Sequence, residues 1–425
     1  MLCDFMLAES LARPPARRTR PSSPSSPSGR TARGWLLAPI LLAALSGCAS
    51  VGYLTQAAHG EWQVLHERQP ITRVIADPHT PAAVRTRLEL VQDARGFAVS
   101  ALDLPDNRSY RTYSDLRRPY VSWNVVAAPR FSVRPLHWCF PIAGCVSYRG
   151  YFHERSARAF AARLAARGDD VDVEGVTAYS TLGHFADPVL SSMLRYDELD
   201  LVGTIFHELA HQLYYVPGDS EFDESFAMTV QAEGLARWLA ARGRSAELQQ
   251  YLDEQRVESA IDHQFAAGRT ELRRLYAEPL PPVRMAARKH EILQQIGRRV
   301  LAIEHRSHLR LGYDEMVAAG LNNASLALIG TYSDCIPGFE RLLHQNDDRL
   351  PLFYQAVRRI GRDPQARRAL CAPAAGGNDH YSAPRSAALR PGGDSHSGAR
   401  AARLAGAMPS RSHPGLVQRL SARSE

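Results

Sequence analysis

The stretch Ile205-Phe206-His207-Glu208-Leu209-Ala210-His211 places two histidines four positions apart among apolar residues. Positions i and i+4 lie on one face of a helix because 3.6 residues make a turn. The two imidazoles can therefore reach one ion, and zinc accepts imidazole nitrogens at roughly 2.0–2.1 Å. The uncharged neighbours indicate a buried helix, where two histidines and a glutamate without a purpose would be costly. We therefore expect one Zn²⁺ ion to be held here.

Glu208 follows the first histidine and can hold a water on the metal without being a ligand itself. Zinc lowers the pKa of such a water towards about 7, and the carboxylate accepts its proton as the water attacks a polarised carbonyl. The sequence thus predicts a zinc-dependent peptidase in which Glu208 is the catalytic base. A peptide is the expected substrate.

A hydrolytic zinc site needs three protein ligands and one open position. A loop at 216–220 turns the chain before a second helix begins, and an antiparallel second helix would bring Glu224 alongside His211. Glu224 is therefore predicted as the third ligand. Glu221, which lies nearer the turn, and Glu233, which would fall beyond the first histidine, are the alternatives.

The rest of the body shows a few strands followed by many helices. The patterns predict strands at 120–126 and 171–180 and helices at 153–167, 197–215 and 223–242, with a long charged stretch at 246–309 and shorter helices to about 360. This order favours an α+β class that is mostly helical, with a small sheet before the metal helix.

Charge is concentrated in the two ends of the chain. Residues 1–47 carry a net charge of +4 and residues 380–425 one of +5, so the body between them carries about −2 although the whole chain has +7. A near-neutral body gives no electrostatic footprint for nucleic acid, and we expect no such partner. The tail from 373 to 425 is rich in Arg, Ala, Gly and Ser and is predicted to be disordered.

The N-terminal region has the pattern of an export signal. An apolar run at 35–45 follows Arg30 and Arg33, and it is too short to span a bilayer. It ends in Leu45-Ser46-Gly47-Cys48, which resembles the bacterial lipobox, so 1–47 is predicted as a signal peptide with an unusually long start. A lipid on Cys48 would anchor the chain to a membrane. The alternatives are a plain secretory signal and a buried helix.

Four other cysteines lie within the predicted body, 48–372. Cys139 and Cys145 stand six apart in a turn-rich stretch, and Cys335 and Cys371 lie near its end. In an oxidising compartment these pairs are candidates for two short-range disulfides, with four buried thiols as the alternative.

Several stretches together resemble a known family, the predicted zinc aminopeptidases of Gram-negative bacteria, many of which are lipoproteins. The resemblance covers most of 48–370 and is densest in these six stretches: Leu45–Ser50, Gly144–Phe152, Ala178–Gly183, His207–Gln212, Asp223–Ala227 and Leu321–Ala324. It implies a zincin-like fold, one zinc ion, and Glu224 as a ligand, because Asp223-Glu224-Ser225-Phe226-Ala227 is similar to a zinc-binding Asn-Glu-x-Phe-Ala segment. Asp223 departs from that pattern, as do His184 and Ala186 where an aromatic residue and an acid are expected.

The resemblance also implies further roles and a location. Ala49 after the lipobox cysteine favours the outer membrane, facing the periplasm. Tyr332 could donate to the oxyanion of the tetrahedral intermediate, although a core tyrosine is the alternative. A segment that pairs with extended substrate is expected before the metal helix, with an ordinary sheet strand as the alternative. It comprises Ala178, Tyr179, Ser180, Thr181, Leu182 and Gly183.

Two other functions compete with the aminopeptidase interpretation. One is a zinc endopeptidase, and the other is a non-catalytic envelope lipoprotein with a structural metal in a closed four-ligand site. Asp219 and Glu221 are candidates for holding a free amine only because they lie near the metal motif.

Overall fold

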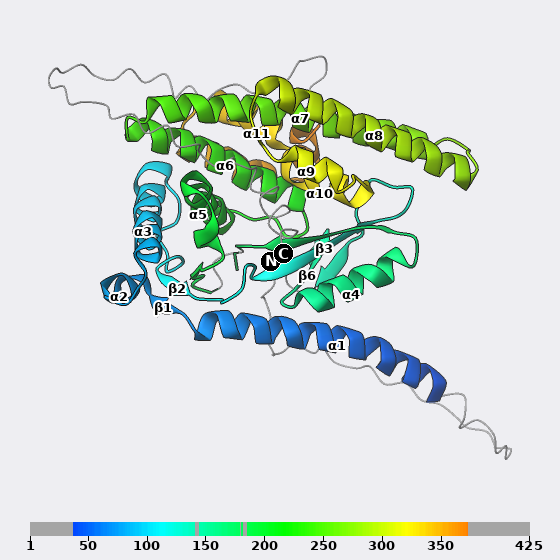
Figure 1. The fold of residues 1–425 in the computed structure, drawn as a ribbon, viewed down its shortest axis with the longest axis horizontal. Helices are drawn as coiled ribbons and strands as arrows, with labels where there is room; N and C mark the ends of the chain where they lie inside the picture. Colours follow the sequence, from blue (N-terminus) through cyan, green and yellow to red (C-terminus); the bar gives the residue numbers. More distant parts are fainter. Residues whose placement is uncertain (1–36, 141–143, 179, 182–184, 373–425) are drawn as a thin grey trace, which may run out of the picture.

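The computed structural model describes residues 37–140, 144–178, 180–181 and 185–372, and most of them are helical (Figure 1). The longer helices are α1 (Leu37–His66), α3 (Ala82–Leu102), α4 (Glu154–Ala165), α5 (Glu198–Leu213), α6 (Ser220–Ala241), α7 (Ser245–Tyr276) and α8 (Pro282–Ser307). The shorter ones are α2 (Ile71–Ala76), α9 (Tyr313–Ala318), α10 (Asn323–Ser333), α11 (Ile336–Gln345), α12 (Leu350–Gly361), α13 (Pro364–Leu370) and the 3₁₀ turn η1 (Met193–Arg195).

The strands form three small sheets. Their bounds are β1 (Gln69–Pro70), β2 (Thr112–Ser114), β3 (Ser122–Ala128), β4 (Trp138–Phe140), β5 (Gly144–Val146), β6 (Tyr148–Tyr151), β7 (Asp170–Val176) and β8 (Val189–Leu190). The sheets have the strand orders β6-β3-β7, β1-β2-β8 and β4-β5. The first is antiparallel throughout and is the largest.

The β6-β3-β7 sheet is covered on both faces, which explains why β3 is buried along its whole length. Trp123, Val125 and Ala127 point to α4, while Val126 packs with Ala324 and Leu328 of α10 on the other face. A strand buried on both sides reads as a continuous apolar run rather than an alternating one. The sheet is thereby fixed between one helix and the helical layer that carries α5 and α6.

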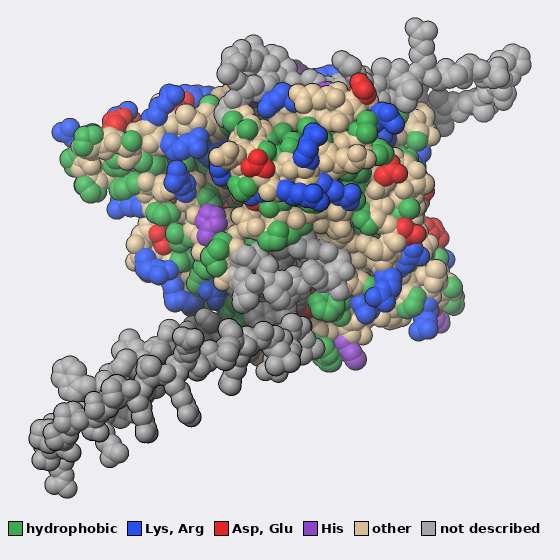
Figure 2. All heavy atoms as spheres, turned by 180° about the vertical axis from the view of Figure 1, so that it is seen from behind, with side chains coloured by type: hydrophobic (Ala, Val, Ile, Leu, Met, Phe, Trp, Pro, Cys, Tyr) green, Lys and Arg blue, Asp and Glu red, His purple; other side chains and the backbone are tan. Residues whose placement is uncertain are grey.

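The main hydrophobic core surrounds α5 and α6. It joins these two helices to α3, α11 and α12, and its largest members include Trp238, Phe206, Phe222, Phe226 and Phe353. The long α7 and α8 pack against each other around a second core and form the upper layer in Figure 1. The face shown in Figure 2 carries Lys and Arg side chains interspersed with hydrophobic and acidic ones.

Two glycines allow α5 and α6 to approach closely. A Cβ atom on Gly203 of α5 would lie 3.0 Å from Gln231 and Leu235 of α6. A Cβ atom on Gly234 of α6 would lie 2.7 Å from a ring carbon of Phe206 in α5. Because Phe206 directly precedes the first histidine of the motif, this packing also sets the position of the predicted metal site.

The predicted α+β class, with mostly helix, is confirmed. The predicted bounds of two helices and one strand differ from the observed ones. The metal helix is α5, two residues shorter at its C-terminus and one at its N-terminus than predicted, and α6 begins at Ser220 rather than near Asp223. The strand expected over 171–180 ends at Val176. Cys139 is joined to Cys145, and Cys335 to Cys371.

The predictions about the two ends fall largely outside the described residues. Residues 1–36 and the tail 373–425 are not described, and of Cys48 only its place within α1 is. Within the part of the chain that is described, no helix has both the length and the apolar character needed to cross a membrane.

The close contact at Gly234 predicts opposite effects for two glycine-to-alanine changes. Gly234→Ala should lower the free energy of unfolding by about 1–3 kcal/mol, because the added methyl group collides with Phe206. The matched control is Gly96→Ala in α3, where a Cβ would meet nothing within 4 Å. This change should raise the free energy of unfolding by about 0.4–1 kcal/mol, since alanine restricts the unfolded chain. Denaturant titration of both variants measures the difference, and equal effects would contradict the packing argument.

Candidate metal centre

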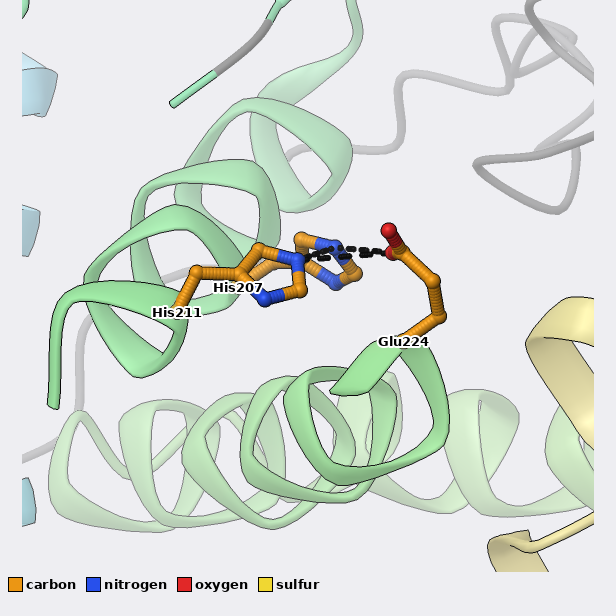
Figure 3. A group of neighbouring side chains, drawn as sticks. All are labelled: His207, His211 and Glu224. Atoms are coloured by element: carbon orange, nitrogen blue, oxygen red, sulfur yellow. Dashed lines mark hydrogen bonds and ion pairs between the residues drawn. The ribbon is translucent and has the colours of Figure 1, made fainter. Parts of the chain in front are cut away.

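Three side chains from α5 and α6 converge on one point. Nε2 of His207 and Nε2 of His211 lie 3.1 Å apart. Oε2 of Glu224 lies 3.3 Å from the first of these nitrogens and 3.4 Å from the second. Figure 3 shows the two imidazoles side by side on α5, with the carboxylate reaching towards them from the first turns of α6. The three ligand-type atoms thus form a nearly equilateral triangle.

This triangle has the dimensions expected for three ligands of one ion. Atoms held at 2.0–2.1 Å from a tetrahedral zinc ion lie about 3.3–3.4 Å from one another. The donor set, two imidazole nitrogens and one carboxylate oxygen, is also one that zinc accepts in catalytic sites. No further His, Cys, Asp or Glu joins the group among the described residues. The residues present therefore fit a zinc ion with a free position.

The α5 helix supplies the two histidines from a buried position. It begins after Asp197, whose side chain accepts a hydrogen bond from the backbone N–H of Asp200 and so caps the first turn. Ile205, Phe206, Leu209 and Ala210 are completely buried. Burial of the flanking apolar residues fixes the rotation of the helix and turns the histidine face towards α6.

The start of α6 is held by two aspartates. The loop after α5 turns at Gly218, which has a φ of 85°. Asp219 then caps α6 by accepting from the N–H of Phe222. Asp223 accepts a hydrogen bond of 2.8 Å from the N–H of Val216, which ties the first turn of α6 back to the loop. The similar zinc-binding segment has asparagine at the position of Asp223, and an asparagine side chain could accept the same hydrogen bond. The difference between the two residues therefore preserves this contact.

The alternatives for the third ligand lie elsewhere. Glu233 forms an ion pair with Arg237 at 2.6 Å, and Glu221 lines a cavity of about 570 Å³ between α6 and α7. Neither belongs to the metal-type group. Asp219, suggested as an amine-binding residue, also pairs with Arg367 at 2.6 Å.

The carboxylates of the site have opposite pKa shifts. Burial alone would raise the pKa of Glu224, but the charges of His211 and His207 and their hydrogen bonds hold it well below its usual range. Burial raises the pKa of Glu208 to about 7, and the nearby charge of Glu224 contributes in the same direction. Burial therefore makes Glu208 a stronger base than a surface carboxylate.

Two tyrosines lie beside this centre. Tyr332 of α10 and Tyr148 of β6 both pack against the small cluster around Val126. Burial raises the pKa of each phenol, and the charge of Glu224 is the largest further contribution for both. The structure thus places the predicted Tyr332 near the carboxylate of Glu224. It adds Tyr148, which the sequence analysis did not single out although it lies in the resembling stretch Gly144–Phe152.

The two asparagines of the resembling stretch have structural contacts. Asn322 caps α10 in a capping box with Ser325. Asn323 donates to the carbonyls of Pro129 and Arg130 and accepts from the hydroxyl of Tyr276. They hold α10, and with it Tyr332, against the sheet.

The segment predicted to pair with substrate differs from the expectation. Because β7 ends at Val176, Ala178, Ser180 and Thr181 are not in a strand, and the prediction of a strand there was wrong. The alternation of Val171 to Val176 stops at Thr177, and the next residues turn towards α5 instead of extending the sheet. Tyr179, Leu182 and Gly183 lie outside the described residues. A contact with substrate stays a prediction.

Comparison with known proteins identifies a family. A family model described as "Putative aminopeptidase" matches residues 52–371. No curated protein and no solved structure gives a significant match.

The triangle predicts that metal affinity depends on Glu224 and not on its neighbour Glu221. Glu224→Gln removes a charged ligand. It should therefore weaken zinc binding by more than the loss of an outer-shell partner does, which is roughly 10–100-fold. Glu221→Gln, the matched control one turn earlier on α6, should leave it unchanged. Competition titration with a zinc chelator measures both affinities. Equal affinities of the two variants would remove Glu224 from the ligand set.

Proposed function

The chain belongs to this family of aminopeptidases, and from that membership we propose that it is a zinc-dependent aminopeptidase with a zincin-like catalytic centre. His207, His211 and Glu224 would hold the ion. The observation that carries the proposal is the triangle of ligand-type atoms at 3.1, 3.3 and 3.4 Å. When bound, zinc supplies a Lewis acid that polarises the scissile carbonyl and makes water acidic enough to lose a proton near neutral pH.

Two other side chains, those of Glu208 and Tyr332, take part in the proposed reaction. Glu208 is the general base: its carboxylate takes the proton of the attacking water and then returns it to the leaving amine. Tyr332 provides a phenol near Glu224 that can donate to the oxyanion. Its hydroxyl is protonated in this role, which agrees with a pKa raised well above its ordinary value by burial.

The number of ligands supports an enzyme rather than a structural metal site. Structural zinc sites are closed by four protein ligands, whereas catalytic ones keep one position open. Only three ligand-type side chains meet within the described residues. The fourth position is therefore available to water or substrate.

The charge around the centre supports a preference for free N-termini. Glu208, Asp223 and Asp187 are buried, and none of them forms an ion pair with Lys or Arg among the described residues. Burial raises the pKa of all three carboxyl groups, so a cation nearby is what favours their negative charge. A divalent ion offsets part of it, and the α-ammonium group of a peptide can offset more. An N-blocked peptide lacks this second contribution.

Replacement of the proposed base tests the mechanism. Glu208→Gln should retain zinc and the fold but lower kcat on aminoacyl substrates by about 10²–10⁴-fold, because the amide cannot accept the proton. Zinc content by elemental analysis and hydrolysis of fluorogenic aminoacyl amides by the purified chain are the measurements. Glu315→Gln, at an exposed position of α9, is the control and should match the wild type.

The same assay separates the competing functions. Equal cleavage of N-blocked peptides would make the protein an endopeptidase. A zinc-loaded wild type that cleaves neither class of peptide would favour a non-catalytic lipoprotein with a structural metal.

We further propose that the protein is anchored to the cell envelope by a lipid on Cys48, on the outer membrane and facing the periplasm. The support is the sequence Leu45-Ser46-Gly47-Cys48-Ala49 after an apolar run with a basic flank. Stable anchoring at a bilayer takes two signals, such as two acyl chains, and a diacylglyceryl cysteine carries more than one acyl chain.

The proposed anchor predicts how one substitution changes the location of the protein. Cys48→Ser should move the protein from the membrane fraction to the soluble periplasmic fraction and abolish incorporation of labelled fatty acid. Cys3→Ser, near the start of the predicted signal peptide and far from the lipobox, is the matched control and should change neither. Continued membrane association of the Cys48 variant would argue against the anchor.

A further inference from the structure

The cavity between α6 and α7 is not used by the mechanism above. Its volume is about 570 Å³, and the end of α10 and the helix α11 complete its walls. Small-molecule sites in proteins enclose roughly 300–1,000 Å³, so the cavity has the size of such a site. Helix α6 serves both places, because Glu224 points to the proposed metal centre while Met228 and Ala232 line the cavity. The ligand-type atoms of that centre belong to residues that do not line the cavity.

A row of carboxylates on α7 borders this cavity. Glu254, Glu258 and Asp262 follow one another at intervals of four residues, so their side chains stack along one face of the helix. Glu258 and Asp262 line the cavity, and Glu258 is only 9% exposed. Like charges at this spacing destabilise a helix. The stability of α7 therefore does not account for the row.

The two carboxylates at the cavity have few partners of their own. Glu258 accepts a 2.7 Å hydrogen bond from the side-chain amide of Gln255, which is neutral. Within the described part of the chain, Asp262 forms neither a hydrogen bond nor an ion pair. Arg269 is the cation that acts most on Asp262, but its guanidinium group is engaged in an ion pair with Asp334. Positive charge at this wall is therefore left to a ligand.

The pKa values of the pair agree with this shortage of positive charge. Burial raises the pKa of Asp262 to about 7. Burial also raises the pKa of Glu258 well above its usual range, and the charges of Asp262 and Glu254 act in the same direction. A carboxyl group in such surroundings ionises fully only when a cation lies beside it.

The walls of the cavity favour an organic cation over a bare metal ion. Divalent ions such as Ca²⁺ take six to eight oxygen ligands. Among the described residues, no further His, Cys, Asp or Glu comes close enough to Glu258 and Asp262 to complete a group of three ligands. The cavity also has apolar lining on three helices, from Met228, Ala266 and Ile336. Such a surface suits the methylene groups of a ligand.

We propose that this cavity binds an aliphatic amine, with its ammonium group held between Glu258 and Asp262 and its methylene groups along the apolar wall. An ammonium group has three N–H donors and can serve both carboxylates at once. Charge-assisted hydrogen bonds of this kind are stronger than those between neutral groups. The site is separate from the proposed metal centre and does not rest on the peptidase function.

The test compares ligands that differ in charge but hardly in shape. Isothermal titration of the purified, metal-free chain with n-butylamine and with putrescine should give saturable binding to one site per chain. Without the metal, the proposed catalytic centre does not compete for the amine. The neutral analogue 1-butanol should bind at least about tenfold more weakly, because it lacks the ammonium charge. Glu258→Gln and Asp262→Asn should each weaken the binding of butylamine by roughly tenfold or more.

Asp253→Asn is the matched control, because Asp253 is an exposed acid of α7 that does not line the cavity. It should leave the affinity for butylamine unchanged. Without ligand, Glu258→Gln should raise the melting temperature, since it removes one of the stacked like charges, whereas a purely structural role of Glu258 predicts a lower one. Wild-type chain that binds no amine, equal binding of butanol, or unchanged affinity in both cavity variants would overturn the proposal. Saturable binding of Ca²⁺ without binding of the amines would overturn it as well.

Discussion

The close packing of α5 against α6 is the constraint on which the centre depends. The two histidines lie four residues apart on one helix, so the helix periodicity alone puts them on the same face. The carboxylate comes from a different helix. Its oxygen reaches both imidazole nitrogens only because Gly203 and Gly234 let the helices approach and because the first turn of α6 is tied back by Asp223. A shift of one ångström between the helices would separate the ligand atoms by more than the tolerance of a zinc site, which is about 0.2 Å.

That constraint explains which parts of the site could be predicted from the sequence. The pair His207 and His211 follows from helix periodicity alone, and the short loop after α5 makes a carboxylate early in the next helix the natural partner. Periodicity did not identify Gln212, which donates to the buried Asp187, although it stands in the same i, i+4 relation to Glu208, because a polar residue at the end of a helix is ordinarily solvated. Tyr148 could not be found in this way either, since its closeness to the centre depends on a sheet register that pairs it with Val126.

The strand that was predicted too long shows the limit of alternation as a signal. The strand was predicted to continue past Val176, but a strand also needs a partner, and β3 pairs with β7 only from Ala128 back to Ser122, which faces Val176. Beyond that residue the backbone N–H and C=O groups must find other partners. They find them in side chains: the hydroxyl of Ser192 donates to the carbonyl of Thr177, and Asp187 accepts from the N–H of Thr181. Side-chain partners of this kind are set by tertiary structure and leave no periodic trace in the sequence.

The electrostatics of the centre connect these observations. Three buried carboxylates, those of Asp187, Glu208 and Asp223, and the partly buried one of Glu224 lie around two imidazoles, and none of them has a Lys or Arg partner among the described residues. Hydrogen bonds from Thr181 and Gln212 satisfy Asp187, whereas Asp223 accepts from the N–H of Val216 through Oδ1 and its buried Oδ2 has no partner among the described residues. Glu224 projects from α6 towards the two imidazoles, and burial on α5 raises the pKa of Glu208, with the charge of Glu224 acting in the same direction. Hydrogen bonding thus accounts for the burial of Asp187. Two glutamates close to each other favour their charged forms only where positive charge lies beside them, which is the physical case for a metal at this point of the fold.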